Sequence, residues 1–190
     1  GELRFDGEPI PSVSSFMPEG AIYMGTFSKI FAPGVRLGWV VAHRKAIDKL
    51  AIGMQCTDQC PNSFTQRIVN EYARRGWIEE QVSRSVQIYR RKRNLLLEAL
   101  KEHFPPEAAW TVPSGGFFLW VRLPDDVDTY TMFKPTVEEE LVAYAAGSSF
   151  YPDRRRTSEL RLAYSQVKPE LIGEGIERLS RAIDKHRALV

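Results

Sequence analysis

A short stretch near the start of the chain combines an amine, hydroxyls and a guanidinium. It reads Ser28-Lys29-Ile30-Phe31-Ala32-Pro33-Gly34-Val35-Arg36-Leu37-Gly38-Trp39, and Thr26 lies just before it. A lysine amine can form a Schiff base with an aldehyde cofactor. Hydroxyls and an arginine can hold a phosphate through charge-assisted, bidentate hydrogen bonds. The residue types at this spacing therefore point to chemistry that needs an aldehyde and a phosphate.

Each of these residues also has an ordinary interpretation. A single lysine or arginine is most often a solvated surface charge, and Thr26 and Ser28 could simply end a strand. The functional interpretation depends on the residues occurring together, with the Pro33-Gly34 turn and the seven-residue step from Lys29 to Arg36 intact. It is this ordered combination that favours a cofactor-binding lysine.

The stretch resembles the pyridoxal-phosphate lysine motif of fold-type I aminotransferases of class I and II. The similarity is to the subgroup of 2-aminoadipate, kynurenine and aromatic transaminases. It implies that Lys29 is the catalytic Schiff-base residue and that its amine moves a proton as general base and acid. It also implies that Thr26, Ser28, Lys29 and Arg36 bind pyridoxal 5'-phosphate.

A second arginine lies in an apolar segment near the end of the chain, in Leu160-Arg161-Leu162-Ala163. Side chains alternate faces along a strand, so Arg161 points away from the core if its two leucine neighbours face it. A surface strand with one outward arginine is the plain alternative. The aminotransferases carry a similar Leu-Arg-Leu-x-Tyr-Ser segment before their last helix. The resemblance implies that Arg161 binds the substrate α-carboxylate with its planar fork.

Two further segments stand near these candidates. Gly115-Gly116-Phe117-Phe118-Leu119-Trp120 also resembles the family, and Phe117 or Phe118 could line a pocket for an apolar side chain or be plain core. Arg154-Arg155-Arg156 departs from the family, which often has glycine there. We interpret these three arginines as a solvated loop.

The elements that must position the candidates follow from hydropathy. Continuous apolar runs at 21–26 and 36–42 predict two strands buried on both faces, with Lys29 on the connection between them. Helices are predicted at 44–54, from 62 or 63 to about 75, at 77–103, and from 169 onwards. Strands are predicted at 115–124 and 160–164, with a short helix and then a strand within 138–145 and a loop at 147–152.

The predicted helix 77–103 is amphipathic and would span about 40 Å at 1.5 Å per residue. Its apolar positions share one face: Ile78, Val82, Val86, Tyr89, Leu96 and Leu100. The cluster Arg90-Arg91-Lys92-Arg93 lies on this helix. A nucleic-acid patch is conceivable, but without interleaved aromatic residues we favour a solvated face.

The predicted fold class is α/β. The order of elements resembles the C-terminal part of a fold-type I pyridoxal-phosphate transferase: a partial large-domain sheet at 1–76, a bridging helix at 77–104 and a small α+β domain at 105–190. The family's ring-contacting Asp, Tyr and Asn and its phosphate loop have no counterpart here. The resemblance therefore implies an incomplete C-terminal half that is inactive alone.

Composition narrows the class of protein. The 190 residues are 43% hydrophobic and 26% charged, with a net charge of +2, which does not argue for nucleic acid or an anionic membrane as partner. No apolar run is long enough to span a bilayer. Cys56 and Cys60 have no nearby histidine, so we predict free thiols in a reducing cytoplasm and no metal site.

These observations predict an aminotransferase that moves an amino group between an amino acid and a 2-oxo acid, and the resemblance implies a homodimer. The alternative is a transaminase-like domain of a transcriptional regulator that senses the cofactor or an amino acid. Similarity of fold does not by itself prove activity. A helix-turn-helix segment upstream would favour the regulator.

Overall fold

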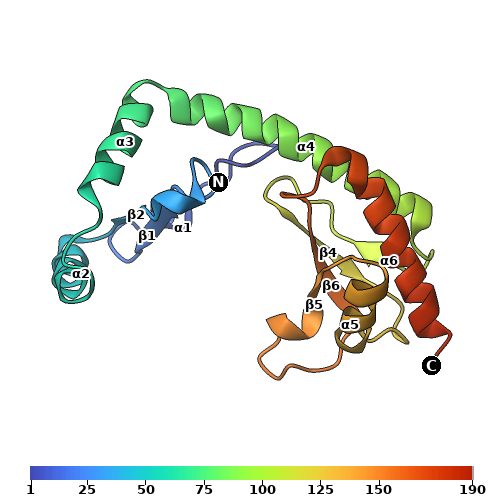
Figure 1. Ribbon diagram of the computed structural model, residues 1–190. Coiled ribbons are helices and arrows are strands. Elements are labelled where there is room, and N and C mark those ends of the chain that lie inside the picture. Colours follow the sequence, from blue (N-terminus) through green and yellow to red (C-terminus); the bar gives the residue numbers. More distant parts are fainter. Residues whose placement is uncertain (190) are drawn as a thin grey trace. The chain divides into compact units, whose positions relative to one another are not determined.

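The computed structural model describes residues 1–189, which form a mixed α/β fold (Figure 1). The chain divides into two compact units, Gly1–Val86 and Gln87–Val190. Helix α4 (Trp77–His103) begins in the first unit and ends in the second, with the bounds predicted for it. The division into 1–76, 77–104 and 105–190 stays a prediction. In the described part of the chain, no helix is both long and apolar enough to cross a membrane.

The sheet of the first unit is an antiparallel pair, β1 (Tyr23–Thr26) and β2 (Gly38–Val41). The register runs from Tyr23 opposite Val41 to Thr26 opposite Gly38. The loop between the strands contains a short 3-10 turn, η1 (Pro33–Val35), and a one-turn helix, α1 (Val13–Phe16), precedes β1. The predicted strand–lysine loop–strand order is confirmed.

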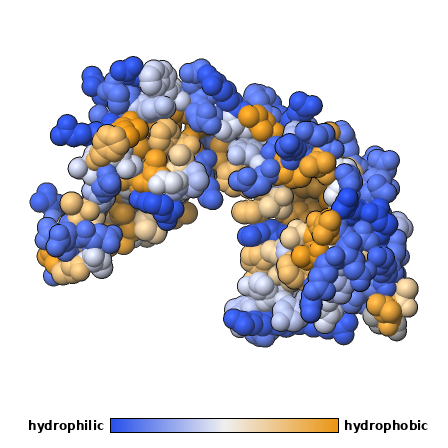
Figure 2. All heavy atoms as spheres, viewed as in Figure 1, coloured by the Kyte–Doolittle hydropathy of each residue, from blue (hydrophilic) through white to orange (hydrophobic). Residues whose placement is uncertain are grey.

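The expected burial of these two strands is wrong for this structure. Five large hydrophobic side chains are exposed on or beside them, namely Ile22, Tyr23, Met24, Val40 and Val41. Figure 2 shows apolar atoms at the surface of this unit. A continuous apolar run is buried only where layers pack on both faces of its sheet, and the two-stranded sheet described here leaves much of both strands open.

Helices α2 (Arg44–Thr57) and α3 (Ser63–Arg74) follow where the sequence places them, although α2 continues three residues beyond the predicted Met54. Asn62 is the N-cap of α3, since its Oδ1 accepts a hydrogen bond from the Thr65 N–H at 3.0 Å. Gly76, with φ of 73°, separates α3 from α4.

The second unit is built on a four-stranded antiparallel sheet of order β3-β4-β6-β5. Its strands are β3 (Ala109–Trp110), β4 (Phe118–Arg122), β5 (Ala145–Ala146) and β6 (Glu159–Ala163). Along the two central strands burial alternates strictly: Leu119, Val121, Leu160 and Leu162 are buried, and their neighbours are half-buried or exposed. One face of the sheet is therefore core, and the other carries polar and aromatic side chains.

The short helix expected within 138–145 is wrong. The helix of this region is α5 (Thr129–Glu139), and only β5 follows it before the 3-10 turn η2 (Gly147–Phe150). Asp128 caps α5 by accepting a hydrogen bond from the Tyr130 N–H. Pro135 lies inside the helix and lacks a donor. From the sequence alone, a proline at this position argues against a helix. The Asp128 cap and tertiary packing compensate for its low helix propensity.

The chain ends in the 3-10 turn η3 (Pro169–Leu171) and α6 (Ile172–Arg187). The apolar residues Ile172, Ile176, Leu179 and Ile183 of α6 are buried, whereas Leu171 belongs to the preceding turn and is exposed. Buried Glu140, at the end of α5, accepts hydrogen bonds from Arg181 and Lys185 of α6. The Lys185 hydrogen bond, with both cations nearby, holds the pKa of Glu140 below its usual value. This network joins α5 to α6.

The face of α4 that the sequence predicts to be apolar is buried or half-buried, and Leu96 and Leu100 lie in the core.

Cys56 and Cys60 are both exposed free thiols.

Candidate functional site

The hydroxyls predicted to bind phosphate lie together at the end of β1. The Thr26 hydroxyl donates to Ser28 Oγ at 3.0 Å, and the Ser28 N–H donates back to Thr26 Oγ1 at 3.1 Å. This reciprocal pair fixes the turn that leads into Lys29, which is exposed. The structure thus brings Thr26 and Ser28 into direct contact and places Lys29 next to them in the chain.

Arg36 lies at the other end of the same loop, just before β2. It has a left-handed backbone, with φ of 49°, and its Nη1 donates to the Pro33 carbonyl at 3.3 Å. A guanidinium has five N–H donors, so this one bond leaves capacity for an anion. An exposed arginine, a hydroxyl pair and an amine within one hairpin loop are a donor set suited to a phosphate carried on an aldehyde cofactor.

Arg161 lies in the middle of β6, on the polar face of the second sheet. It is opposite Trp120 of β4 on one side and opposite the small Ala145 of β5 on the other. The side chain is half-buried between the buried Leu160 and Leu162, as the alternation predicts. Within residues 1–189 it forms no hydrogen bond and no ion pair, so its donors are available to an anion.

Two aromatic rings contact Arg161. Its Cζ lies 3.9 Å from the ring centroid of Phe118 in β4 and 4.8 Å from that of Phe150 in η2. The sequence indicated Phe117 or Phe118 as a residue that could line a pocket, without distinguishing between the two. Phe117 instead packs on Tyr89, at 5.0 Å between centroids. Phe150 was missed, and only its place in a glycine-led loop shortly before β6 could have indicated it.

A glycine allows η2 to approach β6 closely enough for this contact. A Cβ on Gly147 would lie 2.6 Å from the Glu159 carbonyl oxygen, which is too short for any real contact. Thr129 also donates its hydroxyl to the Glu159 carbonyl, at 2.7 Å. The turn that carries Phe150 is therefore held directly against the strand that carries Arg161.

The nearest acidic side chain on the same strand face is already paired. Glu159, two residues before Arg161 in β6, accepts hydrogen bonds from the hydroxyls of Tyr151 and Thr157. These bonds, that of Tyr151 first, hold the pKa of Glu159 below its usual value. The Glu159 carboxylate is therefore hydrogen-bonded to Tyr151 and Thr157 and does not pair with Arg161.

Two buried cations support the strands of this unit, and they correct one prediction. Lys92 and Arg93 of α4 are buried rather than solvated. The Lys92 ammonium donates to the Ser165 carbonyl just after β6, and the Arg93 guanidinium donates to the Pro113 carbonyl ahead of β4, both at 2.7 Å. A long basic side chain can satisfy a buried carbonyl in a loop, and the sequence pattern of a charged cluster does not reveal such partners.

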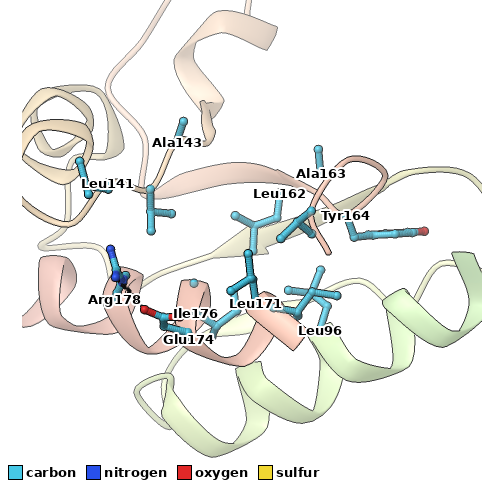
Figure 3. Close-up of a pocket in the computed structure, with 14 residues that line it drawn as sticks. Leu96, Leu141, Ala143, Leu162, Ala163, Tyr164, Leu171, Glu174, Ile176 and Arg178 are labelled. Atoms are coloured by element: carbon cyan, nitrogen blue, oxygen red, sulfur yellow. Dashed lines mark hydrogen bonds and ion pairs between the residues drawn. The ribbon is translucent and has the colours of Figure 1, made fainter. Parts of the chain in front are cut away.

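An apolar cavity of about 390 Å³ lies elsewhere in this unit, beneath the buried face of the sheet (Figure 3). Leu96 of α4, Leu162 of β6 and Ile176 of α6 line it, and the Glu174–Arg178 ion pair lies at its side. None of the predicted site residues is among its lining residues. The cavity therefore includes neither Arg161 nor the residues of the hairpin loop.

Comparisons with known proteins give one consistent family. Residues 3–179 match the family described as aminotransferase class I and II. The chain is 40% identical over 184 residues to aromatic-amino-acid aminotransferase 1 of Thermococcus litoralis, covering 96% of this chain and 44% of that protein. It also resembles, at 29% identity over 95% of this chain and 40% of the relative, the HTH-type transcriptional regulator NorG of Staphylococcus aureus.

Among solved structures, the chain superposes with a TM-score of 0.91 on an alpha-aminoadipate aminotransferase from Thermus thermophilus, at 35% identity. That protein was crystallised with N-(5'-phosphopyridoxyl)-L-leucine, and the match covers 100% of this chain and 49% of the other. The chain thus spans about half the length of the relatives it matches.

Proposed function

Because the chain belongs to the aminotransferase class I and II family, we propose that the full gene product transfers an amino group between an amino acid and a 2-oxo acid, with pyridoxal 5'-phosphate as cofactor. The observation that carries this proposal is the hairpin loop from Thr26 to Arg36, in which an exposed lysine follows a paired Thr26 and Ser28 and precedes an exposed arginine.

Each residue has a separate task in this proposal. Lys29 would hold pyridoxal phosphate through the cofactor's aldehyde, and its amine would accept and return a proton at the substrate α-carbon. Thr26, Ser28 and Arg36 donate hydrogen bonds to the phosphate. Arg161 orients the substrate by its α-carboxylate. Pyridoxal phosphate, when bound, supplies the sink for the electrons released at the α-carbon.

The proposal is tested by spectroscopy on the purified full gene product. With pyridoxal phosphate we expect a visible absorbance band that sodium borohydride abolishes. Titration with an amino acid should convert this band, and a 2-oxo acid should restore it. A protein that takes up the cofactor but whose band responds to no amino acid would refute the transferase.

Arg36 offers a narrower test. The change Arg36→Gln keeps polarity and approximate length but removes the charge, and we expect the dissociation constant for pyridoxal phosphate to rise about ten-fold or more. Hydrogen bonds to charged groups contribute roughly 1.5–3 kcal/mol each. Arg67, an exposed arginine on α3, provides the matched control as Arg67→Gln. Unchanged cofactor affinity, with a raised KM for the amino acid instead, would contradict the phosphate role.

A ligand-sensing domain of a regulator is the second candidate, favoured by the similarity to NorG over most of the chain. The two candidates separate on turnover, because a sensor needs to bind the cofactor or an amino acid without releasing product. Higher identity to aminotransferases than to the regulator supports the enzyme.

The proposal includes a homodimer in the cytoplasm. Three large apolar side chains of α2 are exposed, Leu50, Ile52 and Met54, and support a protein-covered surface on that helix. Light scattering on the full gene product would give the oligomeric state.

A further inference from the structure

We propose that Phe118 and Phe150 are positioning residues that hold the Arg161 guanidinium by its flat face and present its N–H edge to a carboxylate. The inference rests on the role proposed above for Arg161 and adds to it the device that orients the side chain. No hydrogen bond or ion pair within residues 1–189 performs that task for Arg161, which leaves the two rings as its specific contacts.

The distances place both rings within cation–π range of the Arg161 guanidinium. A cation attracted by an aromatic ring lies over the ring face, within about 6 Å of its centroid. The Arg161 Cζ meets this criterion twice, at 3.9 Å over Phe118 and at 4.8 Å over Phe150. All five N–H donors of a guanidinium lie in its plane. Rings that contact the face of this plane leave the donor edge open for bidentate binding.

The rings themselves are anchored on ordered elements. Phe118 is the first residue of β4 and is opposite the small Ala163 of β6. Phe150 packs edge-to-face against Trp120, with ring centroids 5.2 Å apart and planes at 80°. Trp120 is in turn opposite Arg161 in the sheet. The positioning device therefore spans β4, β6 and η2, with Gly147 permitting the approach of the turn.

A fixed guanidinium loses less rotamer freedom when a ligand binds than a mobile one does. The side chains of Phe118 and Phe150 are 44% and 45% exposed, so neither ring is part of the hydrophobic core. We therefore expect their removal to weaken carboxylate binding without unfolding the unit.

The test replaces each ring by a side chain of similar apolar size, with Phe118→Leu and Phe150→Leu in the cofactor-loaded full gene product. Calorimetry measures the dissociation constant of 3-phenylpropionate, a carboxylate without an amino group. We expect it to rise about two- to five-fold for each variant, the effect of one exposed cation–π contact. Binding of 3-phenylpropan-1-ol, which lacks the carboxylate, should change little. Phe150→Tyr, which keeps a ring face, should restore affinity.

Phe133, an exposed ring on α5 that packs on Tyr144, supplies the control as Phe133→Leu and should leave binding unchanged. A double-mutant cycle then separates positioning from direct contact. In an Arg161→Lys background, Phe150→Leu should have little further effect. If it weakens 3-phenylpropionate to the same extent as in the wild type, the ring contacts the ligand itself and the positioning role is wrong.

The remaining outcomes are also decisive. If Arg161→Lys weakens the carboxylate but neither leucine variant does, the positioning role fails while the proposed function stands. If Arg161→Lys has no effect on the carboxylate, the substrate role of Arg161 fails, and the positioning proposal fails with it.

Discussion

Replacing Lys29 by alanine is expected to abolish covalent attachment of pyridoxal phosphate and to lower turnover by at least about 10²-fold. Covalent attachment should be lost completely, because no other side chain of the loop from Thr26 to Arg36 carries an amine. The lower turnover follows from the loss of a positioned acid and base, which typically contributes 10²- to 10⁴-fold. Hydrogen bonding to the phosphate should persist in the variant, since Ser28, Thr26 and Arg36 remain.

The measurement is borohydride reduction of the cofactor-loaded full gene product, followed by peptide mass spectrometry. In the wild type the cofactor mass should appear on the peptide containing Lys29, and in Lys29→Ala it should be missing. Lys49, an exposed lysine on α2, provides the control as Lys49→Ala, which should be labelled like the wild type. Undiminished labelling of the Lys29→Ala protein, at any lysine, would show that the assignment is wrong.

The elements that could be predicted are those with strong local signals. The bounds of α4 follow from its apolar face, from Gly76 before it and from Pro105-Pro106 after it. The cap of α3 follows from Asn62. Such signals act within a few residues in the sequence, so they can be recognised without knowing the fold. The strand alternation around Arg161 is of the same kind.

The features that could not be predicted depend on contacts with residues distant in the sequence. The burial of Lys92 and Arg93 follows from two carbonyls in other loops, and a charged cluster on a helix looks identical whether solvated or buried. Helix α5 forms despite Pro135 because tertiary packing outweighs propensity. The expected coverage of β1 failed because a strand's own residues do not say which layers pack on it.

The residues of the candidate site also fall into those with a local sequence signal and those without one. Lys29, Arg36 and Arg161 could be proposed from the sequence, because the motifs that carry the family resemblance are local in it. Phe150 was not identifiable, because its contact with Arg161 depends on the turn η2 packing against β6. Candidate residues for a site can thus be proposed from a sequence more readily than the contacts that orient their side chains.

Arg161→Lys should separate substrate binding from cofactor binding. Lysine keeps the positive charge, but as a point charge it cannot form two parallel hydrogen bonds to a carboxylate. The change also removes the planar guanidinium, whose Cζ lies over the rings of Phe118 and Phe150. Losing one charge-assisted hydrogen bond corresponds to roughly 1.5–3 kcal/mol, so we expect KM to rise about ten-fold or more. Amino acids and 2-oxo acids should be affected alike, because both carry the same carboxylate.

Steady-state kinetics with amino acids, 2-oxo acids and an amine that lacks a carboxylate distinguish this role from a structural one. The amine should be affected least, and the affinity for pyridoxal phosphate should stay near that of the wild type, since the phosphate has Arg36. Arg122 is the matched control: it lies at the end of β4 on the same sheet face, and Arg122→Lys should leave KM unchanged. If Arg161→Lys instead releases the cofactor, or slows the amine as much as amino acids, then Arg161 is a structural residue of β6, because only carboxylate recognition makes the effect depend on the substrate's carboxyl group.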